Sequence, residues 1–176
     1  LQTNSLKLKA PDGRRFSFRS INKNPERALT QEIRETVYRH LVKELITTQH
    51  PYGGLVAGYL LDQTDILHVS PKLYFLPPQE KLGQYNEDFG NGFGTLELRP
   101  SEKSDPPFAQ ADDIVSSHQM FYALHKYDDH IVDQQAYAKA RVFDMWMGDW
   151  DRHEDNWKWA MFKEGKKTVY RPIPRD

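Results

Sequence analysis

The chain of 176 residues has nearly balanced charge, with 24 Lys and Arg against 25 Asp and Glu and a formal net charge of -1. This balance excludes a global electrostatic attraction to nucleic acid or to an anionic membrane, so any phosphate recognition has to be local. The absence of cysteine excludes disulfides, thiolate metal sites and a cysteine nucleophile. A hydrophobic fraction of 38% is enough for a folded core.

The first 99 residues predict an N-terminal lobe made of a hairpin, a helix and further strands. Residues 1–21 alternate apolar and polar side chains on either side of the turn PDGR, as in a two-stranded hairpin. Thr30 can cap a helix whose apolar residues recur every four positions and which ends near His50. Between Leu55 and Leu98, the runs HVSPKLYFL and GFGTLEL are of β type, and a polar, glycine-rich connection separates them.

Residues 100–176 predict part of a C-terminal lobe, which follows the linker-like segment RPSEKSDPPFAQ. Apolar residues at helical spacing predict helices over Asp112–Lys126 and Asp133–Met147, and Gly148 is a natural stop for the second one. The loop GDWDRHEDNW follows, and then NWKWAMF and KTVYRPIP alternate around the turn EGKK as a second hairpin. We therefore expect an α+β chain with two lobes, 1–99 and 100–176.

The loop after Gly148 concentrates acidic and amide side chains between tryptophans. A carboxylate such as Asp151 can orient a hydroxyl or a water and accept its proton. Asn156 and a second carboxylate would supply the hard oxygen ligands that Mg²⁺ prefers. The arms of the following hairpin bring its two ends together, so Asp176 is a plausible second ligand. The tryptophans of this region, Trp146, Trp150, Trp157 and Trp159, suggest core packing more than a platform for sugars or nucleobases.

The segment Asp151–Asn156, DRHEDN, resembles the catalytic loop of the phosphatidylinositol kinase superfamily, in which D-R-H-x-x-N is followed across a hairpin by a metal-binding Asp. The segment YRPIPRD is similar to the corresponding strand of HipA-type kinases. The same loop and PIPRD also resemble those of a bacterial group of unestablished function, often embedded in larger surface or exported proteins. The match covers residues 148–176 well and the remainder only in its order of elements.

The resemblance implies a role for each matched residue. Asp151 would be the catalytic acidic residue, Arg152 and His153 would support the loop, and Asn156 and Asp176 would bind the metal. It further implies a two-lobed, protein-kinase-like architecture that stops at the metal-binding Asp. Because the chain opens without Met and ends at Asp176, we expect it to be a piece of a longer protein with an additional domain.

The N-terminal lobe departs from the kinase pattern. The cation that would hold the nucleotide phosphates is Arg19 or Lys23, and its acidic partner is Glu32 or Glu35. The first turn has a single glycine where kinases have a glycine-rich turn. GNGFG, residues 90–94, comes after the predicted helix and suits a plain turn better than a phosphate cradle. Glu97 lies where the strand that meets the adenine would enter the linker, or else in an ordinary core strand.

We therefore expect a Mg²⁺-dependent phosphotransferase that moves the γ-phosphate of ATP to an unknown hydroxyl. Nucleotide is the expected partner, and neither nucleic acid nor a membrane segment is expected. One alternative is an inactive pseudokinase or interaction module of a larger bacterial protein. A second alternative is a metal-dependent phosphoesterase that uses Asp151, His153, Asn156 and Asp176. The compartment, cytoplasmic or exported, stays open.

Overall fold

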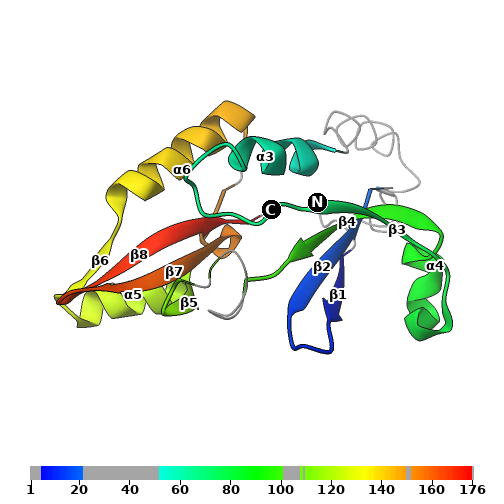
Figure 1. Ribbon diagram of the computed structural model, residues 1–176, viewed down its shortest axis with the longest axis horizontal. Coiled ribbons are helices and arrows are strands. Elements are labelled where there is room, and N and C mark those ends of the chain that lie inside the picture. The colour runs from blue at the N-terminus through cyan, green and yellow to red at the C-terminus, as the bar shows by residue number, and fades with distance from the viewer. Residues whose placement is uncertain (1–4, 22–51, 101–107, 109, 150–151, 176) are drawn as a thin grey trace, which may run out of the picture.

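The computed structural model describes residues 5–21, 52–100, 108, 110–149 and 152–175. Within this part of the chain, two four-stranded sheets and four α-helices form a mixed α+β structure (Figure 1). The helix predicted between Thr30 and His50 lies outside the described residues. None of the described helices is both long and apolar enough to cross a membrane.

The first sheet contains β1 (Ser5–Lys9), β2 (Arg15–Ser20), β4 (Gly92–Leu98) and β3 (Lys72–Leu76), in the order β1-β2-β4-β3 with every pair antiparallel. The predicted hairpin is confirmed, and β4 has the bounds of the run GFGTLEL. One face of this sheet packs on a small core of four buried residues, Leu6, Phe18, Leu82 and Phe89.

Two helical segments were not predicted from the sequence. Helix α3 (Gly53–Leu61) lies at the start of the region, Leu55 to Leu98, in which we expected only short β-type runs and their connections. Its apolar residues do not alternate, and Gly58 lets the helix approach Pro71, whose Cδ would lie 2.9 Å from an added Cβ. The connection between β3 and β4 is also helical, with η2 (Glu80–Tyr85) and α4 (Asn86–Phe89), because it contributes two residues to the core just described.

The second sheet contains β5 (Asp113–Ser116), β7 (Trp157–Glu164), β8 (Lys167–Pro174) and β6 (His130–Val132), in the order β5-β7-β8-β6. The predicted C-terminal hairpin is confirmed as the antiparallel pair β7–β8. Strand β6 runs parallel to β8 and pairs only with Thr168–Tyr170, so the prolines of β8, Pro172 and Pro174, pair on the β7 side alone.

The first helix predicted for the C-terminal half begins later than expected. Residues 113–116 form β5, so the prediction of one helix from Asp112 is wrong. Helix α5 (Ser117–Lys126) is preceded by the N-cap residue Ser116, whose capping box with Gln119 satisfies backbone amides at the start of the helix. Within this helix, Met120 is buried, whereas the neighbouring Phe121 is exposed. Helix α6 (Gln134–Met147) confirms the second prediction to within one residue.

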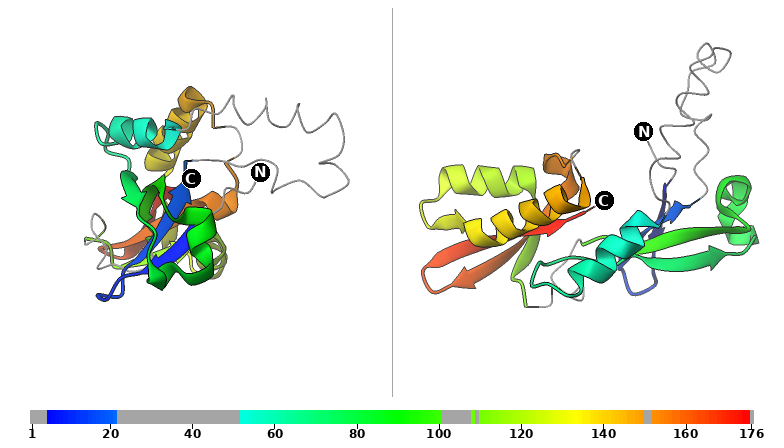
Figure 2. Two further views of the ribbon diagram at one scale, coloured as in Figure 1. Left: turned by 90° about the vertical axis from the view of Figure 1, so that its right-hand side faces the viewer. Right: turned by 90° about the horizontal axis from the view of Figure 1, so that it is seen from above.

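The two sheets lie end to end along the long axis of the molecule, and α3 lies beside α6 (Figures 1 and 2). The segment after α3 packs on the second sheet, because Leu67 and Val69 contact one of its core clusters and Ile66 contacts the other. Residues from the N-terminal half of the chain therefore complete the core of the C-terminal sheet. Each sheet is formed by one half of the sequence, whereas the core of the second sheet contains residues from both halves.

Within the glycine-rich segment, Gly94 has a packing role. A Cβ at Gly94 would lie 2.2 Å from Cζ of Phe18 and 2.7 Å from the carbonyl oxygen of Arg19. The ring of Phe18 is 2% exposed and makes an edge contact with Phe89. The glycine therefore leaves the space beside β4 that the ring of Phe18 occupies, and this accounts for its presence without a ligand.

We expect Gly94→Ala to destabilise the protein by about 1–3 kcal/mol, the usual cost of overpacking a core. Gly92→Ala is the matched control on the same strand, because its added Cβ would have only an ordinary 3.7 Å contact with the oxygen of Phe89. Urea unfolding of both variants measures the difference. Equal free energies of unfolding for the two variants would contradict the packing role.

Candidate functional site

The loop that carries the sequence motif begins at a well-defined helix end. Gly148 follows α6 with φ of 75°, a left-handed conformation that suits glycine. The amide of Gly148 donates to the oxygen of Met145 at 3.2 Å, and the amide of Asp149 donates to that of Asp144 at 2.8 Å. This pair of bonds is the Schellman arrangement, which fixes the direction in which the chain leaves the helix.

Arg152 anchors this loop through a buried guanidinium. Its side chain is 6% exposed and that of Asp144 is 2% exposed, and the two form a fork with N–O distances of 2.9 and 3.2 Å. Asp149 lies 2.6 Å from the same guanidinium, and the ring of Trp157 lies beneath it at 5.3 Å. Burial raises the pKa of the Asp144 carboxyl, while Arg152 beside it acts in the opposite direction.

The same guanidinium connects the loop to the end of β8, because it also donates to the backbone oxygen of Arg175. The amide of Arg175 donates to the oxygen of Asn156 at 2.9 Å, which extends the β7–β8 pairing by one step. On the other side, the hydroxyl of Ser117 donates to the oxygen of Glu154 at 2.7 Å. Asn156 is therefore held beside the residue that precedes Asp176.

Some of the predicted site residues belong to the described part of the chain, and others lie outside it. Asp151, Asp176, Lys23, Glu32 and Glu35 lie outside the described residues. His153 is exposed, whereas Arg152 and Asn156 lie together in the anchored loop. Among the described residues, no group of three or more His, Cys, Asp or Glu side chains is arranged to hold a metal ion.

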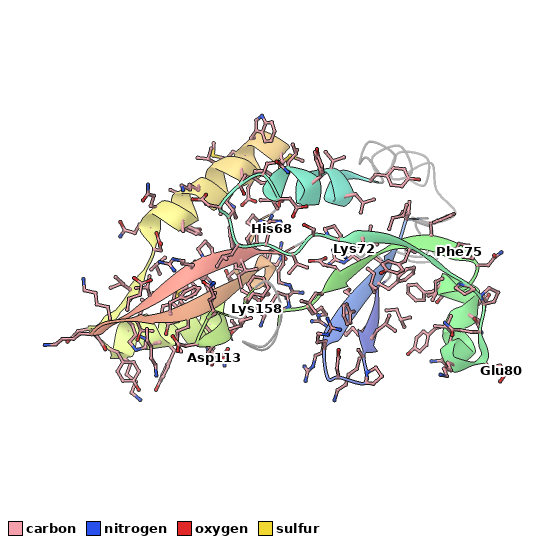
Figure 3. The ribbon with its side chains drawn as sticks, viewed as in Figure 1. His68, Lys72, Phe75, Glu80, Asp113 and Lys158 are labelled. Carbon is pink, nitrogen blue, oxygen red and sulfur yellow. The ribbon has the colours of Figure 1, made fainter. Side chains whose placement is uncertain are left out.

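A second group of charged side chains lies where the two sheets meet, and we call it the basic junction: Arg19, Arg99, Lys158 and Arg175, around Glu97. Arg19 and Glu97 lie on one face of the first sheet, because Arg19 pairs with Thr95 and Glu97 pairs with Ser17. Lys158 lies at the start of β7 (Figure 3). Arg19 and Glu97, two of the predicted cofactor-binding residues, thus lie near Lys158 and Arg175. In the sequence, Lys158 comes shortly after the predicted metal ligand Asn156, and Arg175 directly precedes the predicted ligand Asp176.

Burial and like charges perturb the groups of the basic junction. Burial raises the pKa of the Glu97 carboxyl, and the positive charges of Arg19, Arg175 and Arg99 oppose that rise. Burial lowers the pKa of the Lys158 amine, and the charges of Arg175 and Arg99 lower it further. Burial also lowers the pKa of Arg175, with Glu97 acting against it. The junction therefore holds positive charge in partly desolvated surroundings.

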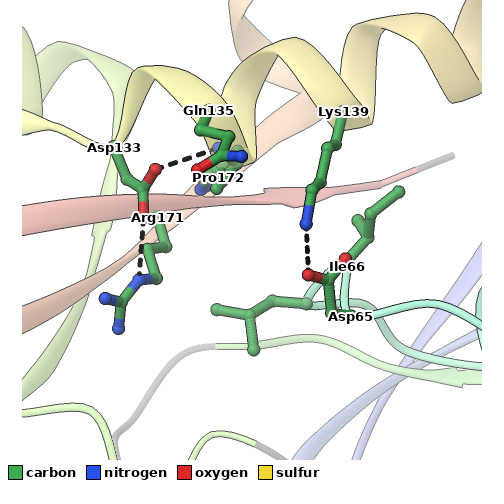
Figure 4. Close-up of a pocket in the computed structure, with 9 residues that line it drawn as sticks. Asp65, Ile66, Asp133, Gln135, Lys139, Arg171 and Pro172 are labelled. Carbon is green, nitrogen blue, oxygen red and sulfur yellow. Dashed lines mark hydrogen bonds and ion pairs between the residues drawn. The ribbon is translucent and has the colours of Figure 1, made fainter.

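A pocket elsewhere on the second sheet has a different character. A cavity of about 190 Å³ lies between the start of α6, residues 171–172 of β8 and residues 65–67 (Figure 4). Its charged residues are paired with one another, Lys139 with Asp65 and Arg171 with Asp133. None of the predicted site residues lines it.

The tryptophans have divided roles. Trp157 and Trp159 are each 4% exposed and pack against Tyr137 in the core. The indole nitrogen of Trp159 donates to the hydroxyl of Ser117 at 3.0 Å, so this ring also supports the loop contact. Trp146 is 69% exposed, so the expectation of core packing is wrong for this residue. Trp150 lies outside the described residues.

The motif alone did not reveal Asp144 or three of the four cations of the basic junction. Asp144 lies four residues after the buried Ala140, so a carboxylate on the apolar stripe of α6 was the available signal. Lys158 stands between two buried tryptophans of a strand, which places it on the opposite face. The sequence around Arg99 and Arg175 has no comparable pattern of buried neighbours that would have indicated their positions.

No protein-family model, no curated protein and no solved structure matches this chain. The arrangement of residues is therefore the basis for the proposals that follow.

We expect Arg152→Ala to destabilise the protein by about 3–5 kcal/mol, because it would leave the buried Asp144 carboxylate without its main partner. Arg141→Ala is the matched control, because Arg141 also pairs with Asp144 at 2.9 Å but its side chain is 34% exposed. Its loss should cost less than about 1 kcal/mol. Chemical unfolding of the two variants tests this difference, and a similar cost for both would contradict the central role of Arg152.

The pH dependence of stability tests the role of the Asp133 carboxylate at the start of α6. Its carboxylate accepts from the amide of Ala136 and pairs with Arg171, and these contacts lower its pKa below 3.8. We expect Asp133→Asn to cost about 0.5–1 kcal/mol near neutral pH, from the lost charge at the helix N-terminus. Since the folded pKa is the lower one, this difference should be complete above pH 3.8 and vanish as pH falls through the folded pKa.

Urea unfolding across this pH range measures the effect, and Asp128→Asn is the control at an exposed position. An Asp133→Asn difference that does not change with pH would show that the carboxylate charge contributes nothing there.

Proposed function

We propose that the chain is a kinase-like phosphotransferase in which ATP and Mg²⁺ bind where the two sheets meet. The γ-phosphate would pass to a hydroxyl whose carrier the residues do not specify. The observation that carries this proposal is the bond between the amide of Arg175 and the oxygen of Asn156. It holds the two ends of the β7–β8 hairpin together, and these ends bear the predicted metal ligands Asn156 and Asp176.

Each residue of the proposed site has a physical task. Asp151 orients the accepting hydroxyl and takes its proton. Arg152 fixes the loop between α6 and β7, because its guanidinium contacts both Asp144 and the end of β8. Arg19 or Lys23 supplies positive charge to the phosphates, and Glu32 or Glu35 orients that cation. Glu97 and its neighbours border the space in which the nucleotide would lie.

The residues present suit a magnesium ion in their chemistry. An amide oxygen from Asn156 and a carboxylate from Asp176 are hard oxygen ligands, and a cofactor site of this type completes its shell with phosphate oxygens and water. When bound, the ion would neutralise charge on the phosphates of the nucleotide.

The proposal is tested by isothermal titration of the chain with ATP, with Mg²⁺ and with EDTA. We expect binding that depends on Mg²⁺ and that weakens about tenfold or more in Asn156→Ala and in Asp176→Ala, since each variant loses one oxygen ligand. Asp151→Asn should keep ATP binding and lose phosphoryl transfer, measured as release of ADP. Glu154→Gln is the matched control, because it removes an exposed charge from the same loop.

Absence of ATP binding by a folded protein would refute the proposal. Binding without any ADP release in the unmodified chain would favour the non-catalytic alternative, a nucleotide-binding interaction module. Hydrolysis of a phosphoester without nucleotide would favour the phosphoesterase.

A further inference from the structure

The basic junction differs from the other cation sites of the described chain in its charge balance. Elsewhere, partly buried cations have acidic partners: Arg152 pairs with Asp144 and Asp149, and Arg171 pairs with Asp133 and Glu164. In the junction, three arginines, Arg19, Arg99 and Arg175, interact with the carboxylate of Glu97, and Lys158 interacts with Arg99 and Arg175. No described carboxylate forms an ion pair with Arg99, Lys158 or Arg175.

The positions of these cations concentrate their charge in one place. They come from the ends of four strands, with Arg19 on β2, Arg99 just after β4, Lys158 on β7 and Arg175 just after β8. Arg99 and Arg175 each interact electrostatically with Glu97, and Lys158 interacts with both of these arginines. Like charges held together in partly desolvated surroundings are unfavourable unless an anion lies among them.

The junction is accessible to such an anion. All five side chains belong to residues of intermediate exposure, so they are neither sealed in a core nor spread on the open surface. Guanidinium forks match the geometry of phosphate oxygens, and a lysine adds a compact charge. Because the whole chain has a net charge of -1, it has no general attraction for polyanions, and the local positive charge of the junction suits a small anion.

We propose that the basic junction is a binding site for a small polyanion of the diphosphate type, and that it needs no divalent metal. Lys158 and Arg175 contact the anion from the second sheet, and Arg99 and Arg19 contact it from the first. Glu97 offsets part of the positive charge and keeps the arginines oriented. This site does not require the proposed phosphotransferase activity, because it uses neither a nucleoside nor Mg²⁺.

Titration calorimetry with inorganic pyrophosphate in EDTA tests the site on the chain as it stands. We expect binding by the unmodified protein, and a loss of affinity of about tenfold or more in Lys158→Gln and in Arg175→Gln, because each removes a charged hydrogen-bond donor. Lys158→Arg should keep most of the affinity. Lys163→Gln is the matched control, since it removes one exposed lysine from the same strand.

Circular dichroism shows whether each variant is folded, and Lys158→Ala or Arg175→Ala, which also removes the charge, replaces a glutamine variant that does not fold. No binding of pyrophosphate, or an equal loss of affinity in Lys163→Gln, would overturn the proposal. If pyrophosphate and ATP compete, the diphosphate group that binds at the basic junction belongs to a nucleotide. If both bind at the same time, the ligand of the junction is a separate phosphorylated molecule.

Discussion

The buried ion pair between Asp144 and Arg152 is the interaction on which the arrangement of the candidate site depends. Asp144 belongs to α6 and Arg152 belongs to the loop that follows, so their contact fixes the loop against the helix. The same guanidinium reaches the backbone at the end of β8. Such a pair does little for net stability compared with apolar packing, but the loss of either partner is costly, so the geometry is enforced.

Much of the fold was predictable where the pattern is local. The hairpin of β1 and β2, strand β4, helix α6 and the hairpin of β7 and β8 all have a clear period of two or of three to four residues. The missed elements are short or depend on distant partners. Strand β5 has four residues and exists because it pairs with β7, while α3 is apolar without a diagnostic alternation.

The candidate site was predictable only in part, for the same reason. The DRHEDN motif predicted that Arg152 and Asn156 lie together, because both residues belong to one short loop. The basic junction draws on residues 19, 97–99, 158 and 175, which approach one another only after both sheets form. Asp144 could have been found as an acidic residue on an apolar stripe, whereas Arg99 and Arg175 required the tertiary structure.

The prolines of β8 have a consequence for the backbone at one side of the second sheet. In β8, the amide of Thr168 points toward β6 and the amide of Arg175 points toward β7, so even-numbered positions face the side of β6. Strand β6 pairs with β8 only as far as Tyr170, and no described strand continues this pairing at Pro172 and Pro174. Pro172 is fully buried, so an amide at that position would be a buried donor without a strand partner. Because neither proline has an N–H, the strand pairing can end inside the packed protein without leaving such a donor.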